Sequence, residues 1–209
     1  VEYTLTQLRK GEVAFDSIVN VKGEVTVVNL YYNGYTVFDG EASLFVFTSS
    51  TPTVKVGDVG KVFGTYVVNF DTNYQIKEAT FTQTGTTTEF APIAKEISEL
   101  WIGDGKTKAE VLAINSNPAN ENFFEVEGII AERADLANAN DYQLVLFDKD
   151  ENIETSVANY LRFYYRDPLF AELGNLVGKR VKVQFVMGSI RNDRLTGSEN
   201  WVYEISVTK

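Results

Sequence analysis

The stretch Val21-Lys22-Gly23-Glu24-Val25 decides the fold, because a second version of it, Val126-Glu127-Gly128-Ile129-Ile130, stands later in the chain. Each version alternates apolar and other residues about a central glycine, which predicts a half-buried strand with a bulge or sharp bend at the glycine. Each is followed by a Phe-Asp turn, then a turn of Val, Gly and a charged residue, then another apolar strand. We therefore expect two copies of one small β unit.

Turn residues divide the first copy into five strands. Asn33-Gly34 is a strong hairpin signal, and Asp39-Gly40 and Val56-Gly57-Asp58 mark further turns. The predicted strands are residues 19–27, 35–38, 44–47, 61–70 and 74–82. Long strands coiled by glycines favour a small closed barrel over a flat meander. A short helix, capped by Thr4 and ended by Gly11, is expected to precede this barrel.

The second copy is predicted to repeat this arrangement with insertions. Its strands are expected at residues 124–131, 142–147, 157–165, 180–187 and 201–207, with a short helix within 167–174 that plugs the barrel. Between the copies, Thr107 is expected to cap a helix equivalent to the N-terminal one, and Trp101 and Ile102 to pack between the units. We predict an all-β protein with barrels at 1–90 and 121–209, joined by an ordered linker at 91–120.

The order of these pieces resembles the OB-fold repeats of bacterial extracellular nucleases and surface lipoproteins. The matching pieces are V-x-G-x-V, F-D-G-E, V-G-D and N-Y-Q-I at residues 21–25, 38–41, 56–58 and 73–76. The second copy matches more loosely, since Val177-Gly178-Lys179 replaces V-G-D. The resemblance implies two OB-fold-like five-stranded Greek-key barrels in a nucleic-acid-binding lipoprotein. It implies no catalytic residue, because the chemistry of such nucleases lies on another domain.

Charge and composition narrow the classes of function. The net charge is −10, whereas nucleic-acid-binding proteins usually carry a basic surplus for phosphate contacts. The chain has no Cys and no His, which removes disulfides, thiol nucleophiles, the usual zinc sites and histidine bases. No apolar run reaches the roughly 18 residues of a membrane span, so we expect no transmembrane segment. Abundant Thr, Asn, Tyr and Gly lead us to expect an extracellular or surface-anchored bacterial protein.

No constellation of residues predicts an enzyme, a metal site or a cofactor. Asp148-Lys149-Asp150-Glu151-Asn152 begins like a calcium loop, but Ile153 and Asn159 stand where an EF-hand needs Gly and Glu. The other carboxylates are scattered through turns and exposed strand positions, and no glycine-rich phosphate loop is present. We expect a non-catalytic binding protein with no cofactor.

A row of alternating tyrosine and arginine in the second copy is the candidate ligand-binding surface. Because residues two apart on a strand share a face, one face of this strand carries Tyr160, Arg162, Tyr164 and Arg166. Such a row offers stacking faces and cations to a single-stranded oligonucleotide, with each stacked base worth about 1–3 kcal/mol. It would serve an oligosaccharide equally well. The structural alternative is surface pairing with acids such as Glu127.

Two further regions complete the candidate surfaces. Arg191 and Arg194 fall between the last two strands, in a loop that OB folds use for ligands, or else in a solvated turn. In the first copy, aromatic residues flank two turns that are expected to meet at one mouth of the barrel. They are Tyr31, Tyr32, Tyr35, Tyr66, Phe70 and Tyr74. With few cations nearby, they favour the alternative function, an interaction module that contacts protein or carbohydrate at the cell surface.

Overall fold

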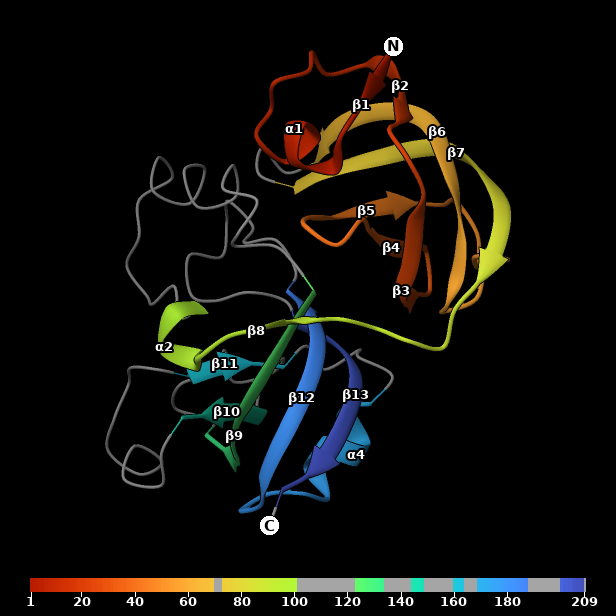
Figure 1. The fold of residues 1–209 in the computed structure, drawn as a ribbon. Helices are drawn as coiled ribbons and strands as arrows, with labels where there is room; N and C mark the ends of the chain where they lie inside the picture. The colour runs from red at the N-terminus through yellow and green to blue at the C-terminus, as the bar shows by residue number, and fades with distance from the viewer. Residues whose placement is uncertain are drawn as a thin grey trace.

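The computed structural model describes residues 1–69, 73–100, 123–133, 144–148, 160–163, 169–187 and 200–208. Within these ranges the chain is mainly β-strand, arranged as two sheets with three short helices (Figure 1). The fold class is therefore all-β, as the sequence predicts.

The first sheet closes into a five-stranded barrel. Its strands are β3 (Val25–Tyr31), β4 (Gly34–Phe38), β5 (Ser43–Phe47), β6 (Asp58–Asn69) and β7 (Asn73–Thr86). The order around the barrel is β3-β4-β5-β7-β6, with β6 returning to β3. Parallel pairing of Phe45 with Gln75 and of Val46 with Ile76 joins β5 to β7 and closes the ring. Two further strands, β2 (Ser17–Val21) and β1 (Glu2–Tyr3), extend this sheet from β6.

Glycines make the tight connections of this barrel as the sequence predicts. The β3–β4 hairpin turns at Tyr32-Asn33 and places Gly34 opposite Tyr31. A Cβ on Gly34 would lie 2.2 Å from the ring of Phe45, so no larger residue fits there. Gly57 has a positive φ of 92° and donates its N–H to the Val27 carbonyl at 2.8 Å, which fixes the start of β6.

The barrel interior is filled by the inward residues of alternating strands. Along β6, Val62 and Tyr66 are fully buried, and they meet Val37, Val46 and Ile76 of the other strands. Each buried aliphatic side chain of this kind stabilises the fold by about 1.5–3 kcal/mol. The period-two alternation seen in the sequence is thus what holds the barrel closed.

Helix α1 (Leu5–Arg9) covers one part of this core. Its N-terminus is a capping box, in which Thr4 Oγ1 accepts from the Gln7 N–H at 3.1 Å and Gln7 Oε1 accepts from the Thr4 N–H at 3.0 Å. Leu5 and Leu8 are completely buried in the barrel core. The Tyr66 hydroxyl donates to the Leu8 carbonyl and ties the helix to β6.

The second sheet repeats the strand order of the first. It comprises β9 (Phe123–Glu132), β10 (Leu144–Phe147), β11 (Tyr160–Arg162), β12 (Arg180–Met187) and β13 (Asn200–Val207), in the order β11-β10-β9-β12-β13. Helix α4 (Phe170–Gly174) lies between β11 and β12, where the sequence predicts it, and buries Leu173 in this core. In the part of the chain that the structure describes, β11 and β13 do not pair. The prediction of a closed barrel is therefore confirmed for the first copy, whereas the described second copy is an open sheet.

The register of the sheets corrects the alignment of the two glycines that define the repeat. Phe124 and Gly128 lie opposite Phe185 and Val181, so β9 runs alongside β12 without an extra residue. In the first copy Val19 and Val25 lie opposite Gly64 and Gly60, which leaves two extra residues around Gly23.

Gly128 therefore corresponds to Val25, not to Gly23. Gly23 has a positive φ of 80° and lies in the bend between β2 and β3, with open space around it. A Cβ on Gly128 would lie 2.3 Å from the Phe147 carbonyl oxygen. The first glycine makes a bend, and the second permits a close approach.

A strand–helix unit precedes each sheet. In the first copy it is β1 and α1, and in the second it is β8 (Ile93–Ala94) and α2 (Ile97–Leu100). Both short strands pair in parallel with the strand that follows them, β1 with β2 and β8 with β9. Ile97 is completely buried in the second core, as Leu5 is in the first. The equivalent of the N-terminal helix thus begins at Ile97, earlier than the sequence prediction; the helix expected after Thr107, with Trp101 and Ile102, lies outside the described residues.

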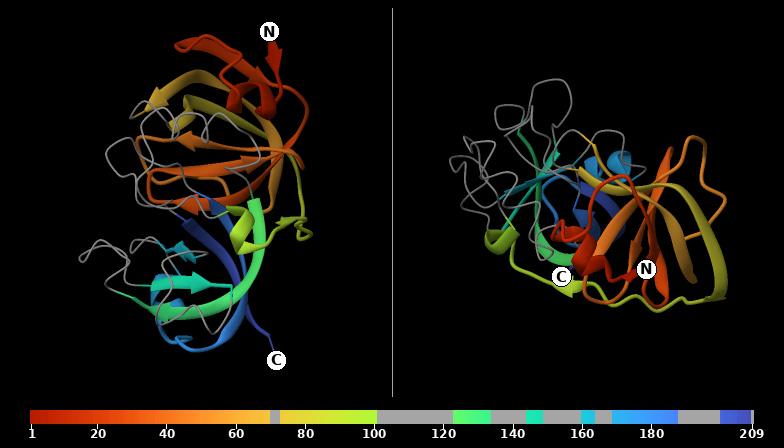
Figure 2. Two further views of the ribbon diagram at one scale, coloured as in Figure 1. Left: turned by 90° about the vertical axis from the view of Figure 1, so that its left-hand side faces the viewer. Right: turned by 90° about the horizontal axis from the view of Figure 1, so that it is seen from above.

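The two sheets lie next to each other (Figure 2). A small apolar cluster joins them where they meet. Val28 and Phe38 come from the outer face of the barrel, and Phe123 and Val186 come from β9 and β12. The rings of Phe38 and Phe123 lie 5.8 Å apart with an edge-to-face geometry. The segment between β7 and β8, which contains Phe90, packs against this cluster. The junction therefore has an apolar core of its own.

Candidate functional site

The predicted tyrosine–arginine row begins on β11, of which the structure describes residues 160–163. Leu161 and Phe163 point into the second core, as the alternation predicts. Tyr160 lies on the opposite face but is only 4% exposed. It packs in a cluster with Ala131, Val145 and Phe147, with its ring 5.9 Å from that of Phe147. This corrects the expectation that Tyr160 offers an open ring face.

The structure describes little of the other residues of the predicted ligand-binding surface. The backbone of Arg162 pairs with Val145 on β10. Tyr164, Arg166, Arg191 and Arg194 lie outside the described residues. Ligand binding by these side chains stays a prediction.

The cations of β12 form pairs with acids across the sheet. Arg180 lies 3.6 Å from a carboxylate oxygen of Glu127, and Lys182 lies 3.2 Å from one of Glu125. Gln184 also donates to Glu125 at 2.9 Å. A phosphate ligand would have to compete with these carboxylates, so the β12 cations do not form a free basic stripe.

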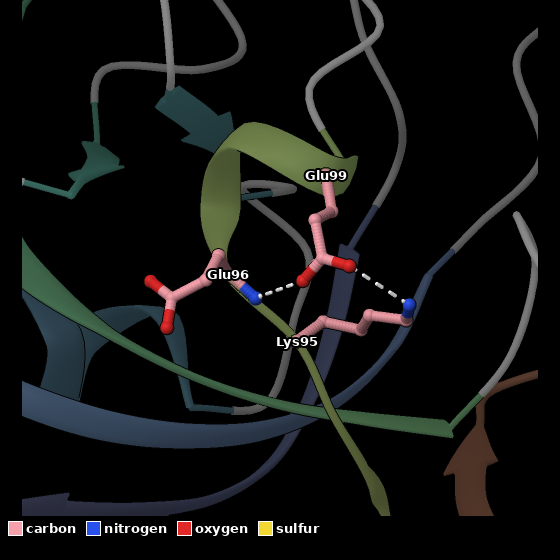
Figure 3. Close-up of polar contacts among 3 residues, drawn as sticks. All are labelled: Lys95, Glu96 and Glu99. Atoms are coloured by element: carbon pink, nitrogen blue, oxygen red, sulfur yellow. Dashed lines mark hydrogen bonds and ion pairs between the residues drawn. The ribbon is translucent and has the colours of Figure 1, made fainter.

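A charged cavity of about 320 Å³ lies where α2 meets this face of β9. Figure 3 shows its edge, where Glu99 accepts from the Glu96 N–H at 2.8 Å and pairs with Lys95 at 3.0 Å. The backbone hydrogen bond from Glu96, followed by the side-chain bond from Lys95, holds the pKa of Glu99 below its ordinary value. Lys182 also lines the cavity, and both of its lysines are paired with glutamates. Three of its four glutamates, Glu99, Glu125 and Glu127, are thus paired with cations of the same chain.

Three of the six aromatic residues predicted to rim the first barrel are core residues, and Phe70 lies outside the described residues. Tyr35, Tyr66 and Tyr74 are 3%, 0% and 8% exposed, and burial raises the pKa of Tyr35 to about 12. The buried guanidinium of Arg9 lies 5.8 Å from the centre of the Tyr74 ring, and burial lowers the pKa of Arg9 to about 10. Of this set, Tyr32 is 60% exposed. Tyr35, Tyr66 and Tyr74 therefore serve to fill the barrel.

A cleft of about 300 Å³ opens beside the apolar cluster that joins the two sheets. We call it the junction cleft. Its apolar wall is formed by Val28, Phe38, Val59, Phe90, Ala91 and Phe123. Three carboxylates also line it, from Glu24 before β3, Asp39 after β4 and Glu89 in the segment that leads to β8. The cleft thus combines apolar surface with negative charge.

Local hydrogen bonds place each carboxylate. Asp39 Oδ1 accepts from the N–H groups of Glu41 and Ala42, at 3.0 and 2.8 Å, in the turn after β4. Glu24 Oε1 accepts from the Thr84 hydroxyl at 2.6 Å. The Glu89 N–H donates to Thr87 Oγ1 at 3.0 Å, which orders the backbone that carries this side chain. The cleft is built from three segments that the barrel fixes independently.

The charged side chains described in the junction cleft are all acidic. No Lys or Arg is among the described residues that line it. None of the ion pairs in the described part of the chain involves Glu24, Asp39 or Glu89. An ionised carboxylate accepts up to about four hydrogen bonds, so each retains capacity for a donor from outside. The cleft is therefore suited to a cationic group attached to an apolar body.

Sequence reasoning missed the junction cleft because its residues are dispersed along the chain. In the sequence, Phe38 and Asp39 indicate only a turn, and Phe90 lies at the edge of the expected linker. The one available signal is that apolar residues, Phe90 and Phe123, flank the region between the copies. That signal indicates packing between the units but not the acids that surround it.

Comparison with protein-family models and with curated protein sequences finds no match to the chain. Among the described residues, no helix is long and apolar enough to cross a membrane. In the same residues, no three acidic side chains are grouped so that they could hold a metal ion.

Proposed function

We propose that this chain is a non-catalytic interaction module that binds a basic segment of a partner protein. The observation that carries the proposal is the junction cleft, where Glu24, Asp39 and Glu89 stand beside apolar wall residues and no cation is found among the described lining. Charge complementarity of this kind speeds association and selects a partner of opposite sign. An exported or surface-anchored location belongs to the same proposal and rests on composition alone.

The strand order of the first barrel supports an OB-type fold for the module. In that fold, a five-stranded Greek-key barrel binds extended ligands over its strands and the adjoining loops. The junction cleft lies beside β3 and β4, the first two strands of the barrel, and includes the turn that follows β4. Its position thus agrees with the use of the barrel's outer face for binding.

Single-stranded nucleic acid is the second candidate ligand. It is favoured by the sequence alternation of tyrosine and arginine that begins on β11, where Leu161 and the adjoining Phe163 point into the second core. Against it stand the net charge of −10 and the ion pairs of Arg180 and Lys182. A protein partner is therefore the better supported of the two.

Fluorescence anisotropy separates these candidates with labelled probes of opposite charge. One probe is a short basic peptide, and the other is a single-stranded oligonucleotide of mixed sequence. We expect the peptide to bind at about 50 mM salt and more weakly at about 200 mM, and the oligonucleotide not to bind at either concentration. Binding of the oligonucleotide without the peptide would overturn the proposal in favour of the second candidate. Binding of neither probe would overturn both.

A further inference from the structure

We propose that the junction cleft receives the side chain of an arginine from the partner protein. This inference rests on the proposed function and adds the residue that the cleft recognises. It follows from three properties of the cleft, namely its size, its aromatic wall and its carboxylates.

The size of the cleft suits a single side chain. About 300 Å³ is at the lower end of the range found for small-molecule sites, roughly 300–1,000 Å³. An extended chain would need a longer groove, whereas one long side chain fits this volume. The three methylenes of an arginine can pack on Val59 and Ala91, which are accessible, while the charged end stays at the rim.

The wall of the cleft is aromatic, which favours a planar cation. Phe38, Phe90 and Phe123 line it. Phe38 and Phe123 are only 7% and 0% exposed, so Phe90 is the ring that a ligand can reach. Phe123 makes edge-to-face contacts with both other rings at 5.8 and 6.5 Å. These mutual contacts hold the rings in fixed orientations. A guanidinium stacks on aromatic faces and is more weakly hydrated than an ammonium. Arginine therefore loses less hydration than lysine on entering this site.

The carboxylates come from three different segments, and this distribution also favours arginine. Its guanidinium presents five N–H donors in a planar fork, so that one group can donate to more than one carboxylate. A lysine ammonium has three donors around a single point. A metal ion is a poorer occupant, because the acids of the described chain are not grouped as metal ligands.

The charged cavity beside α2 provides an internal comparison. There Glu125 forms an ion pair with Lys182, and Glu127 forms one with Arg180 of the same chain. Among the described residues of the junction cleft no such cation lines the wall, and we assign that role to the partner's arginine.

Glu127 supplies a matched control for Glu24. Both carboxylates accept a hydrogen bond from a threonine, Glu24 from Thr84 of β7 at 2.6 Å and Glu127 from Thr208, the residue after β13, at 3.5 Å. Glu24→Gln and Glu127→Gln change the net charge equally. Non-specific attraction of a basic probe therefore falls equally in the two variants.

The test uses two capped tripeptides, Gly-Arg-Gly and its neutral isostere with citrulline in place of arginine. Backbone and methyl NMR shifts of the whole chain are followed during titration with each. We expect the arginine peptide to shift Val28, Val59 and Ala91, and the citrulline peptide to leave them unmoved. Glu24→Gln and Glu89→Gln should each weaken binding up to about fivefold, as for an exposed charge pair, and Phe90→Leu should weaken it while preserving apolar volume. Glu127→Gln should leave the affinity for the tripeptide within about twofold of the unaltered chain, because a distant charge is screened.

Each other result contradicts the inference in a distinct way. If the basic peptide of the anisotropy assay binds but the arginine tripeptide shifts residues elsewhere, the protein-binding function stands and the cleft is not its site. If Glu127→Gln weakens binding as much as Glu24→Gln, the attraction is one of net charge alone. If a lysine tripeptide binds as well as the arginine one, the cleft recognises a cation but not a guanidinium. If the basic peptide itself fails to bind, the proposed function fails first.

Discussion

The two β units of this chain share one strand order but differ in how that order is completed. In the first, parallel pairing of β5 with β7 closes the barrel. In the second, the described strands stop at β11 and β13 as an open sheet. Both units have a preceding strand–helix pair, a glycine of positive φ before the fourth strand, at Gly57 and Gly178, and a bulge between the last two strands.

The difference shows which parts of the unit are set by local chemistry. The turn glycines and the helix caps recur because each satisfies a nearby backbone requirement. The close contacts between distant strands do not recur. Gly34 allows close packing within the first barrel, and Gly128 allows it within the second, at positions that do not correspond. The two cores are therefore packed through close contacts at different positions.

The largest expected effect comes from exchanging the residues at one equivalent position. The first barrel places Val25 where the second places Gly128. In Gly128→Val the new Cβ would meet the Phe147 carbonyl oxygen at 2.3 Å and Ile97 Cδ1 at 2.7 Å. We expect the free energy of unfolding of the second unit to fall by about 3 kcal/mol, measured by urea denaturation.

Gly23→Ala is the matched control for that substitution. It meets nothing within 4 Å but requires a non-glycine residue at a φ of 80°. Its expected cost is about 1 kcal/mol from backbone strain alone. Equal losses in the two variants would contradict the register correction and would restore Gly23 and Gly128 as equivalents.

The repeat, the all-β class and most strands follow from the sequence because alternation and turn residues are local signals. Helix α4 and the β3–β4 hairpin, whose turn lies one residue earlier than Asn33-Gly34, are examples. The equivalence of Gly23 and Gly128 is wrong because register is decided by pairing with β6 and β12, which a strand's own residues do not reveal. The burial of Tyr160 was not predicted for a related reason. Alternation along a strand assigns a residue to one face of the sheet but does not reveal which residues cover that face.

The junction cleft could not be predicted at all from the sequence. Glu24, Asp39 and Glu89 become neighbours only after the barrel has closed and the segment toward β8 has crossed its outer face. Each acid looks ordinary in its local context, as part of a strand end, a turn or a loop. Sites of this kind require the tertiary structure.

Alkaline pH should destabilise the first unit more than the second. The core position occupied by Tyr35 on β4 is occupied by Leu144 on β10, which cannot ionise. Burial raises the pKa of Tyr35 from 10.0 to about 12, so its contribution to stability is present below pH 10 and is lost as pH rises toward 12. Denaturation followed across this pH range should show a smaller loss in Tyr35→Phe. An unchanged profile in that variant would assign the alkaline loss to other groups, such as Tyr66, whose pKa burial also raises.

The smallest expected effect distinguishes the two capped helices under acid. Gln7 in α1 and Glu99 in α2 accept from the backbone N–H three residues earlier, at 3.0 and 2.8 Å, but only the carboxylate can be protonated. The pKa of Glu99 is lowered from 4.5, so its stabilising contribution is present above pH 4.5 and is lost as pH falls through the lower folded-state value. Because Glu99 is fully exposed to solvent, the change should be small and should diminish as salt screens its pairing with Lys95. In Glu99→Gln the second unit acquires the cap of the first, and the acid dependence of its stability should become shallower. A Gln7→Glu variant should introduce the same dependence into the first unit; if it does not, the cap of α1 and that of α2 are not energetically equivalent.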